Sequence, residues 1–130
     1  MYNNLAAQAY QKASQATANP RELEANLLMK AAQRLQMLVD NWDDKGKYEL
    51  DDALTYNRRL WTILVTSATS ADSALPQPVQ QNIANLALFI FKHSITVLAN
   101  PHQDRLATLI QINRNIAEGL RGMIPAEAGV

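Results

Sequence analysis

Residues 50–65, LDDALTYNRRLWTILV, decide the fold class of this chain. Their apolar side chains recur at steps of three and four residues, which is the spacing of one face of an α-helix. Charged residues take the opposite side, so the stretch predicts a helix with one face turned toward a core. Two members of that face, the large Trp61 and the amide Asn57, are unusual in a helical bundle. The whole face consists of Leu50, Ala53, Leu54, Asn57, Leu60, Trp61 and Leu64.

Four further helices are predicted around this one, over residues 4–18, 20–42, 76–98 and 101–122. Asn19-Pro20 and Asn100-Pro101 each place a capping residue before a proline at the first helical position. Most connections between the helices are short, so neighbouring helices are expected to run antiparallel. The pattern predicts an all-α, single-domain bundle of about five helices.

The helix predicted over residues 76–98 is the most apolar of the five. Between residues 86 and 91 apolar side chains surround it, so we expect this helix at the centre of the bundle. One face of it consists of Val79, Asn82, Ile83, Leu86, Phe89, Ile90 and His93, and this face is widened by Phe91, Ile95 and Leu98. The last helix carries a heptad-like stripe of Leu106, Leu109, Ile110, Asn113, Ile116, Ala117 and Leu120.

Length and composition describe one small domain. The chain has 130 residues, of which 48% are hydrophobic, enough to fold around its own core. We assign residues 1–122 to a single helical domain and residues 123–130 to a flexible C-terminal tail. Lys and Arg (12) balance Asp and Glu (12), so no global field attracts nucleic acid or anionic lipid, although a local patch escapes such a count.

The N-terminus lacks the basic start and apolar core of a signal peptide. The longest apolar run, residues 86–91, is far shorter than the roughly 20 residues of a membrane-spanning helix. Cysteine is absent, which excludes disulfides and thiolate chemistry. We therefore expect a cytoplasmic protein without membrane attachment.

No set of residues predicts catalysis. His93 and His102 lie nine positions apart, which matches no metal-ligand spacing on a helix. Arg58-Arg59 has the chemistry to contact phosphate, but an exposed pair near acidic residues is usually a solvated face. The sequence predicts no enzymatic activity, no catalytic or cofactor-binding residues, no cofactor and no metal.

The acidic connection over residues 43–47 has some features of a calcium-binding loop, with acidic residues and a glycine between two helices. With Gly46 at the sixth position of an EF-hand, Lys45 would stand at a ligand position and Asp52 would replace the bidentate Glu. Both residues argue against calcium, so a solvated turn is expected.

Several residues in order along the chain carry a resemblance to a known family. They are Tyr10, Leu27, Ala31, Ala32, Leu35, Ala53, Leu54, Asn57, Leu60, Trp61, Leu75, Pro76, Asn82 and the closing stretch LIQINRNIAEGL at residues 109–120. Over about residues 5–122, the chain resembles the flagellar biosynthesis regulator FlaF family, small bacterial proteins needed for flagellin production and export.

The resemblance implies packed helices without a catalytic centre and a role between flagellin messenger and secreted flagellin. We expect a cytoplasmic secretion chaperone that holds a terminal amphipathic helix of flagellin in an apolar groove. The alternative is a post-transcriptional regulator of flagellin synthesis that acts on translation, alone or with another regulatory protein. Zero net charge and the lack of an aromatic–basic platform disfavour contact with nucleic acid.

Candidate residues for the partner groove come from the apolar stripes of three helices. They are Asn57, Leu60, Trp61, Leu64, Asn82, Leu86, Asn113, Ile116 and Leu120. Two other interpretations stay open, namely that these stripes form only the core of the protein and that they mediate self-association.

Three amides, Asn57, Asn82 and Asn113, fall within apolar stripes of different helices. A buried amide needs a hydrogen-bond partner. The three amides either bond one another or nearby backbone and fix the helix register, or at least one of them bonds an incoming helix.

Overall fold

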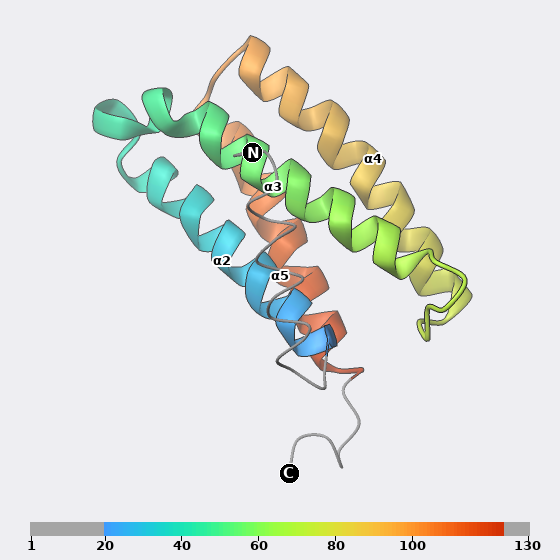
Figure 1. Ribbon diagram of the computed structural model, residues 1–130. Helices are drawn as coiled ribbons and strands as arrows, with labels where there is room; N and C mark the ends of the chain where they lie inside the picture. Colours follow the sequence, from blue (N-terminus) through green and yellow to red (C-terminus); the bar gives the residue numbers. More distant parts are fainter. Residues whose placement is uncertain (1–19, 124–130) are drawn as a thin grey trace, which may run out of the picture.

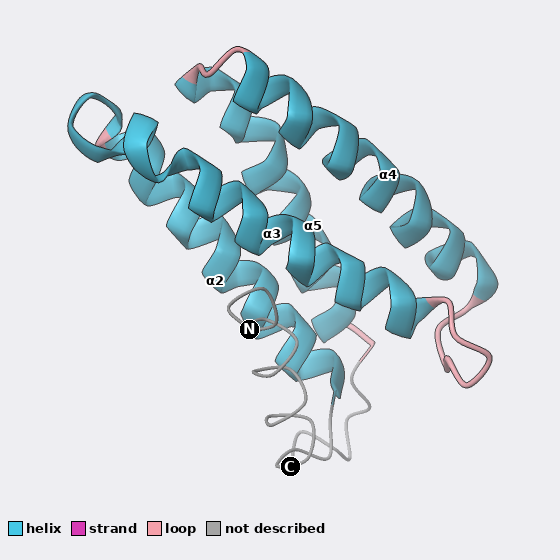
Figure 2. Ribbon diagram, turned by 45° about the horizontal axis from the view of Figure 1, so that its top comes forward, coloured by secondary structure: helices cyan, strands magenta, loops and turns pink. Residues whose placement is uncertain are grey.

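The structure, a computed structural model, describes residues 20–123 (Figure 1). These residues form four α-helices joined in part by two short helical turns, and none of them forms a strand (Figure 2). The all-α prediction is confirmed. The helix expected over residues 4–18, the cap at Asn19 and the tail after residue 123 lie outside the described residues. The elements are α2 (Pro20–Asp40), η2 (Trp42–Gly46), α3 (Lys47–Ala68), α4 (Gln77–Ala99), η3 (Gln103–Leu106) and α5 (Ala107–Arg121).

The four described helices form an antiparallel bundle. Figures 1 and 2 show the chain reversing its direction at every connection, so consecutive helices run antiparallel. α2 and α5 lie side by side and make the most extensive contact, while α3 packs on α2 and on α4. α4 lies on the outer side of α3. The described part of the chain is therefore a bundle in which α2 packs extensively on α5 and on α3, and α4 makes its most extensive contact with α3.

The core lies where the apolar faces of α2, α3 and α5 meet. The face predicted over residues 50–65 is confirmed, because all seven of its members are buried. Trp61, the largest of the fully buried side chains, belongs to a core cluster made mostly of leucines and alanines. The alanines Ala25, Ala31, Ala32, Ala53 and Ala117 are all buried. Small side chains of this kind allow neighbouring helices to approach closely.

The prediction that the most apolar helix is central is wrong. Only one face of α4 is buried, and it consists of Ile83, Ala87, Ile90, Ser94 and Val97. Leu88, Phe89, Ile95 and Leu98 are exposed. The apolar run at residues 86–91 surrounds the helix, so its pattern does not show how many of its sides a neighbour covers. In the fold α3 covers one side.

The predicted start of the last helix is also wrong. Asn100 ends α4, since its backbone N–H donates to the Thr96 carbonyl oxygen. The Nδ1 atom of His102 then accepts a hydrogen bond from the Asp104 N–H and caps η3. α5 begins only at Ala107. The backbone of His102 is extended, so the chain changes direction before the new helix begins.

The acidic connection between α2 and α3 is a π-helical turn, η2. Asp43, Asp44 and Lys47 are exposed, as expected for a solvated turn, whereas Gly46, which ends η2, is buried. A Cβ atom on Gly46 would lie 2.6 Å from Cε3 of Trp42 and 2.8 Å from the Leu38 carbonyl oxygen. The Trp42 ring and the end of α2 therefore approach the backbone too closely for any side chain at this position.

Gly46→Ala is expected to destabilise the protein because the added methyl group overlaps the Trp42 ring and the Leu38 carbonyl oxygen. We expect the free energy of unfolding to fall by about 1–3 kcal/mol, the usual cost of overpacking. Urea denaturation followed by circular dichroism measures it.

Gly119→Ala is the matched control, because a Cβ there meets no heavy atom within 4 Å on the exposed side of α5. It should raise stability by about 0.4–1 kcal/mol. If Gly46→Ala raised the free energy of unfolding as much as Gly119→Ala, the close approach at Gly46 would not contribute to stability.

Candidate partner-binding surface

The nine candidate residues lie partly in the core of the protein and partly at its surface. Leu86 and Ile116 are half-buried, and Asn82 is exposed, so the placement of Asn82 within an apolar stripe is wrong. The remaining six are buried, namely Asn57, Leu60, Trp61, Leu64, Asn113 and Leu120. A partner would reach these six only by separating the helices. The nine residues do not form one open surface.

Asn113 is the centre of a buried hydrogen-bond network. Trp61 Nε1 donates to Asn113 Oδ1 over 2.8 Å. Asn113 Nδ2 donates to Asn57 Oδ1 over 2.7 Å and lies 3.4 Å from the Leu28 carbonyl oxygen, which also accepts from it. An indole N–H can only donate, so it fixes which end of the Asn113 amide faces Trp61. The network therefore has one direction, from Trp61 through Asn113 to Asn57.

This network joins three helices, because Leu28 belongs to α2, Asn57 and Trp61 to α3, and Asn113 to α5. For Asn57 and Asn113, the structure agrees with the interpretation that buried amides bond one another and nearby backbone. One group is left over, since the buried Asn57 Nδ2 has no hydrogen-bond partner. The residues of the network are buried in the interior of the fold, so a surface for a partner would have to consist of other residues.

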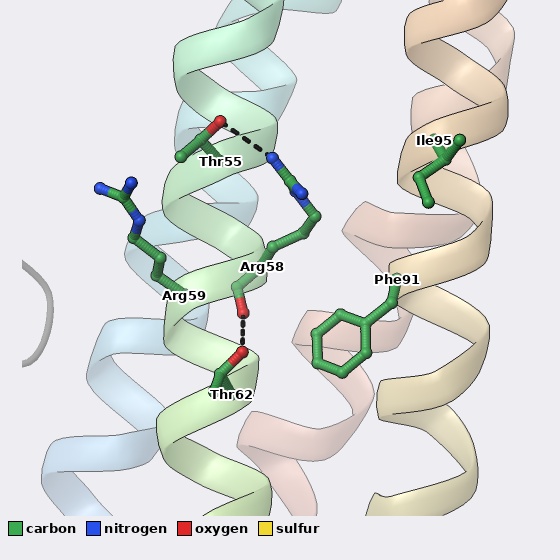
Figure 3. A pocket seen from close by; sticks show the side chains of 6 residues that line it. All are labelled: Thr55, Arg58, Arg59, Thr62, Phe91 and Ile95. Atoms are coloured by element: carbon green, nitrogen blue, oxygen red, sulfur yellow. Dashed lines mark hydrogen bonds between the residues drawn. The ribbon is translucent and has the colours of Figure 1, made fainter. Parts of the chain in front are cut away.

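An open groove of about 330 Å³ lies between α3 and α4 (Figure 3). One wall comes from α3 and the other from α4. Phe91 points across the groove toward α3, and Ile95 follows one turn further along α4. We call this hollow the α3–α4 groove; it is lined by Thr55, Arg58, Arg59, Thr62, Phe91 and Ile95.

The α3 wall combines aliphatic surface with a cation. Arg58 Nη2 donates to Thr55 Oγ1 over 3.2 Å, and Thr62 Oγ1 donates to the Arg58 carbonyl oxygen over 2.9 Å. Both hydroxyls thus have partners within α3, which leaves their methyl groups as contact surface. Arg58 and Arg59 are half-buried and not the solvated pair expected from the sequence. Figure 3 shows Arg58 on the groove side of α3 and Arg59 directed away from α4.

The α4 wall continues into an exposed apolar stripe. Leu88, Phe91, Ile95 and Leu98 follow one another at steps of three, four and three residues, which is the spacing of the seam of a coiled coil. Leu88 is 54% exposed and Ile95 is 63% exposed. We call these four residues the α4 stripe. The sequence pattern predicted three of them as a widening of the buried face. The stripe repeats the three- and four-residue steps of the buried face one position later in the chain, so spacing alone does not separate the exposed residues from the buried ones.

Among the described helices, α4 is the one long and apolar enough to cross a membrane by length and composition. Core helices of soluble proteins pass the same test, and 28% of the most apolar part of α4 is buried inside the bundle. Lys92 and His93 lie in its middle, and His93 Nε2 donates to the Arg105 carbonyl oxygen over 2.8 Å. In the structure α4 is therefore a helix of the bundle, with one face buried and another exposed to solvent.

Fold and surface together define a small all-α bundle protein with an open helix face that suits the binding of another helix. The chain belongs to a flagellar protein family: the family model described as "Flagellar protein FlaF" matches residues 6–120. This confirms the resemblance seen in the sequence. A comparison with curated proteins returned no match, and neither did a comparison with solved structures.

Replacing the three amides by leucine should give three different effects on stability. Asn113→Leu leaves the Trp61 N–H and Asn57 Oδ1 without their partners, and we expect a loss of about 2–4 kcal/mol in the free energy of unfolding. Asn57→Leu removes the Oδ1 acceptor of Asn113 Nδ2, which keeps the Leu28 carbonyl oxygen as acceptor, and it also removes a donor that has no partner, so it should cost less than about 2 kcal/mol. Asn82→Leu, at an exposed site, should stay within about 0.5 kcal/mol of the parent.

Urea denaturation of the three variants checks this order. Equal losses for Asn57→Leu and Asn113→Leu would contradict the central position of Asn113 in the network. A large loss for Asn82→Leu would contradict its exposure.

Proposed function

We propose that this protein is a cytoplasmic secretion chaperone for flagellin, which holds a terminal amphipathic helix of flagellin against the α4 stripe. The proposal is supported by the family, which is flagellar, and by the exposed apolar side of α4. The terminal segments of flagellin are amphipathic helices that stay unassembled until export. The role proposed is one of binding, without catalysis and without a cofactor.

The spacing of the α4 stripe suits a helix as the bound element. Residues three and four apart form a continuous ridge on one side of a helix, and a second helix packs against such a ridge at a shallow angle. The α3–α4 groove runs beside this ridge, so the second helix would contact both α3 and α4. A helix in a groove is a common mode of peptide recognition.

Burial of the α4 stripe by a bound helix would contribute favourable free energy to binding. Full burial of a Leu or Ile side chain contributes about 1.5–3 kcal/mol, and Leu88 and Ile95 both have more than half of their surface left to bury. Part of this gain offsets the lost freedom of the two partners. The remainder suits a chaperone, which must bind flagellin and release it again at export.

The double variant Leu88→Gln, Ile95→Gln is expected to weaken flagellin binding at least tenfold without loss of stability. Both side chains are exposed in the free protein, and Gln keeps the helix propensity. Isothermal titration of the purified protein with monomeric flagellin of the same organism measures the affinity, and light scattering measures the size of the complex. Thermal denaturation checks the fold.

Met37→Gln is the matched control, because Met37 is 59% exposed but lies on α2. Its affinity for flagellin should equal that of the parent. If the parent bound no flagellin at tens of micromolar but bound flagellin messenger tightly, a role in translation would replace this proposal. Binding of the double variant with parental affinity would remove the α4 stripe as the site.

A further inference from the structure

Arg58 is a cation with few partners inside the α3–α4 groove. Its guanidinium has five N–H donors, and Nη2 donates to Thr55 Oγ1. Nε is shielded from solvent and has no hydrogen-bond partner. Arg58 forms no ion pair with a carboxylate among residues 20–123.

This arrangement differs from that of an ordinary surface arginine. A solvated arginine satisfies its donors with water, whereas Arg58 is half-buried and its Nε is not accessible. A shielded donor without an acceptor raises the free energy of the free protein. The side chain gains free energy if it rotates toward an acceptor that enters the groove.

The chemistry around Arg58 restricts what that acceptor is. Phe91 and Ile95 form the opposite wall, so the entering element must be mainly apolar where it faces α4 (Figure 3). A single guanidinium beside an apolar wall complements a single carboxylate better than a chain of phosphates. An aspartate or glutamate accepts two parallel hydrogen bonds from one edge of a guanidinium.

We propose that Arg58 selects the helix bound in the α3–α4 groove by pairing with an aspartate or glutamate that borders the apolar face of that helix. This inference rests on the proposed function and names the chemistry of the flagellin segment that binds. When the helix enters, the Arg58 side chain leaves Thr55 and turns to the carboxylate. One hydrogen bond to a neutral hydroxyl is exchanged for a bidentate pair with a carboxylate that includes Nε.

The pairing adds selectivity that the α4 stripe lacks. Apolar contact is non-directional and accepts any amphipathic helix of suitable size. A helix without the acidic residue would cover Arg58 with apolar atoms and leave a buried charge without a partner. Such a helix is rejected by the desolvation of the guanidinium.

Three variants of Arg58 test the inference against monomeric flagellin of the same organism. Arg58→Gln is expected to weaken binding roughly 10- to 100-fold, the usual range for a lost charge-assisted contact. The affinity of Arg58→Lys should lie between those of the parent and Arg58→Gln, because lysine keeps the charge but not the planar guanidinium. Arg58→Glu should bind most weakly of the three. The parental affinity should decrease with added NaCl, and that of Arg58→Gln should depend on salt less steeply.

The partner carboxylate is found by changing each Asp and Glu of the terminal segments of flagellin to its amide. One substitution should reproduce the loss seen with Arg58→Gln and should add no further loss when combined with it. Arg114→Gln is the matched control, because Arg114 is also half-buried but lies on α5. It should leave the affinity unchanged.

The outcomes separate this inference from the proposed function. If Arg58→Gln bound like the parent while the Leu88→Gln, Ile95→Gln variant did not, flagellin would bind the α4 stripe without selection by Arg58. Losses of equal size for Arg58→Gln and Arg114→Gln would also overturn the inference. If the parent itself bound no flagellin, the proposed function would fail first.

Discussion

The hydrogen bonds of Asn113 are the constraint on which the alignment of the helices depends. Apolar faces drive α2, α3 and α5 together, but apolar contact is non-directional and changes little when one helix slides along another. The polar network does not permit such sliding. Displacing α5 by one turn would separate Asn113 from the Trp61 N–H, from Asn57 Oδ1 and from the Leu28 carbonyl oxygen. Buried polar groups without partners are costly, so one alignment is selected.

α4 stands outside this network. Its buried face packs on α3 through apolar side chains, and its polar ties are local or lead to η3 through His93. A helix attached on one side only leaves its other side to water or to a partner. The candidate surface therefore arises from how the bundle is assembled, because α4 makes its most extensive contact with α3 and keeps Leu88 and Ile95 exposed.

The α3–α4 groove carries a local positive charge that the net charge of the chain does not reveal. The whole chain is balanced, with 12 cationic and 12 acidic residues, and this balance says nothing about any one site. In the α3–α4 groove, Arg58 is held against aliphatic surface without an opposing carboxylate from residues 20–123. A cation placed in this way has a stronger effect than one on an open surface, because the shielded guanidinium is poorly hydrated.

The sequence by itself determined the helical class, the face of α3 and the family. These follow from local periodicity, since a helix repeats its buried positions every three to four residues whatever packs against it. The sequence also marked Asn57 and Asn113 as amides that need partners. It did not determine which amides meet, and Asn82, chosen by the same pattern, is exposed.

Only the tertiary structure decided which apolar residues remain uncovered. Leu88 and Ile90 are two residues apart in the same apolar run, yet Leu88 is exposed and Ile90 is buried. Hydrophobic character is a property of the residue, whereas exposure depends on which neighbouring helix lies on that side. Because α3 covers one side of α4 and no described helix covers the other, the candidate site appears on the helix that the sequence placed at the centre.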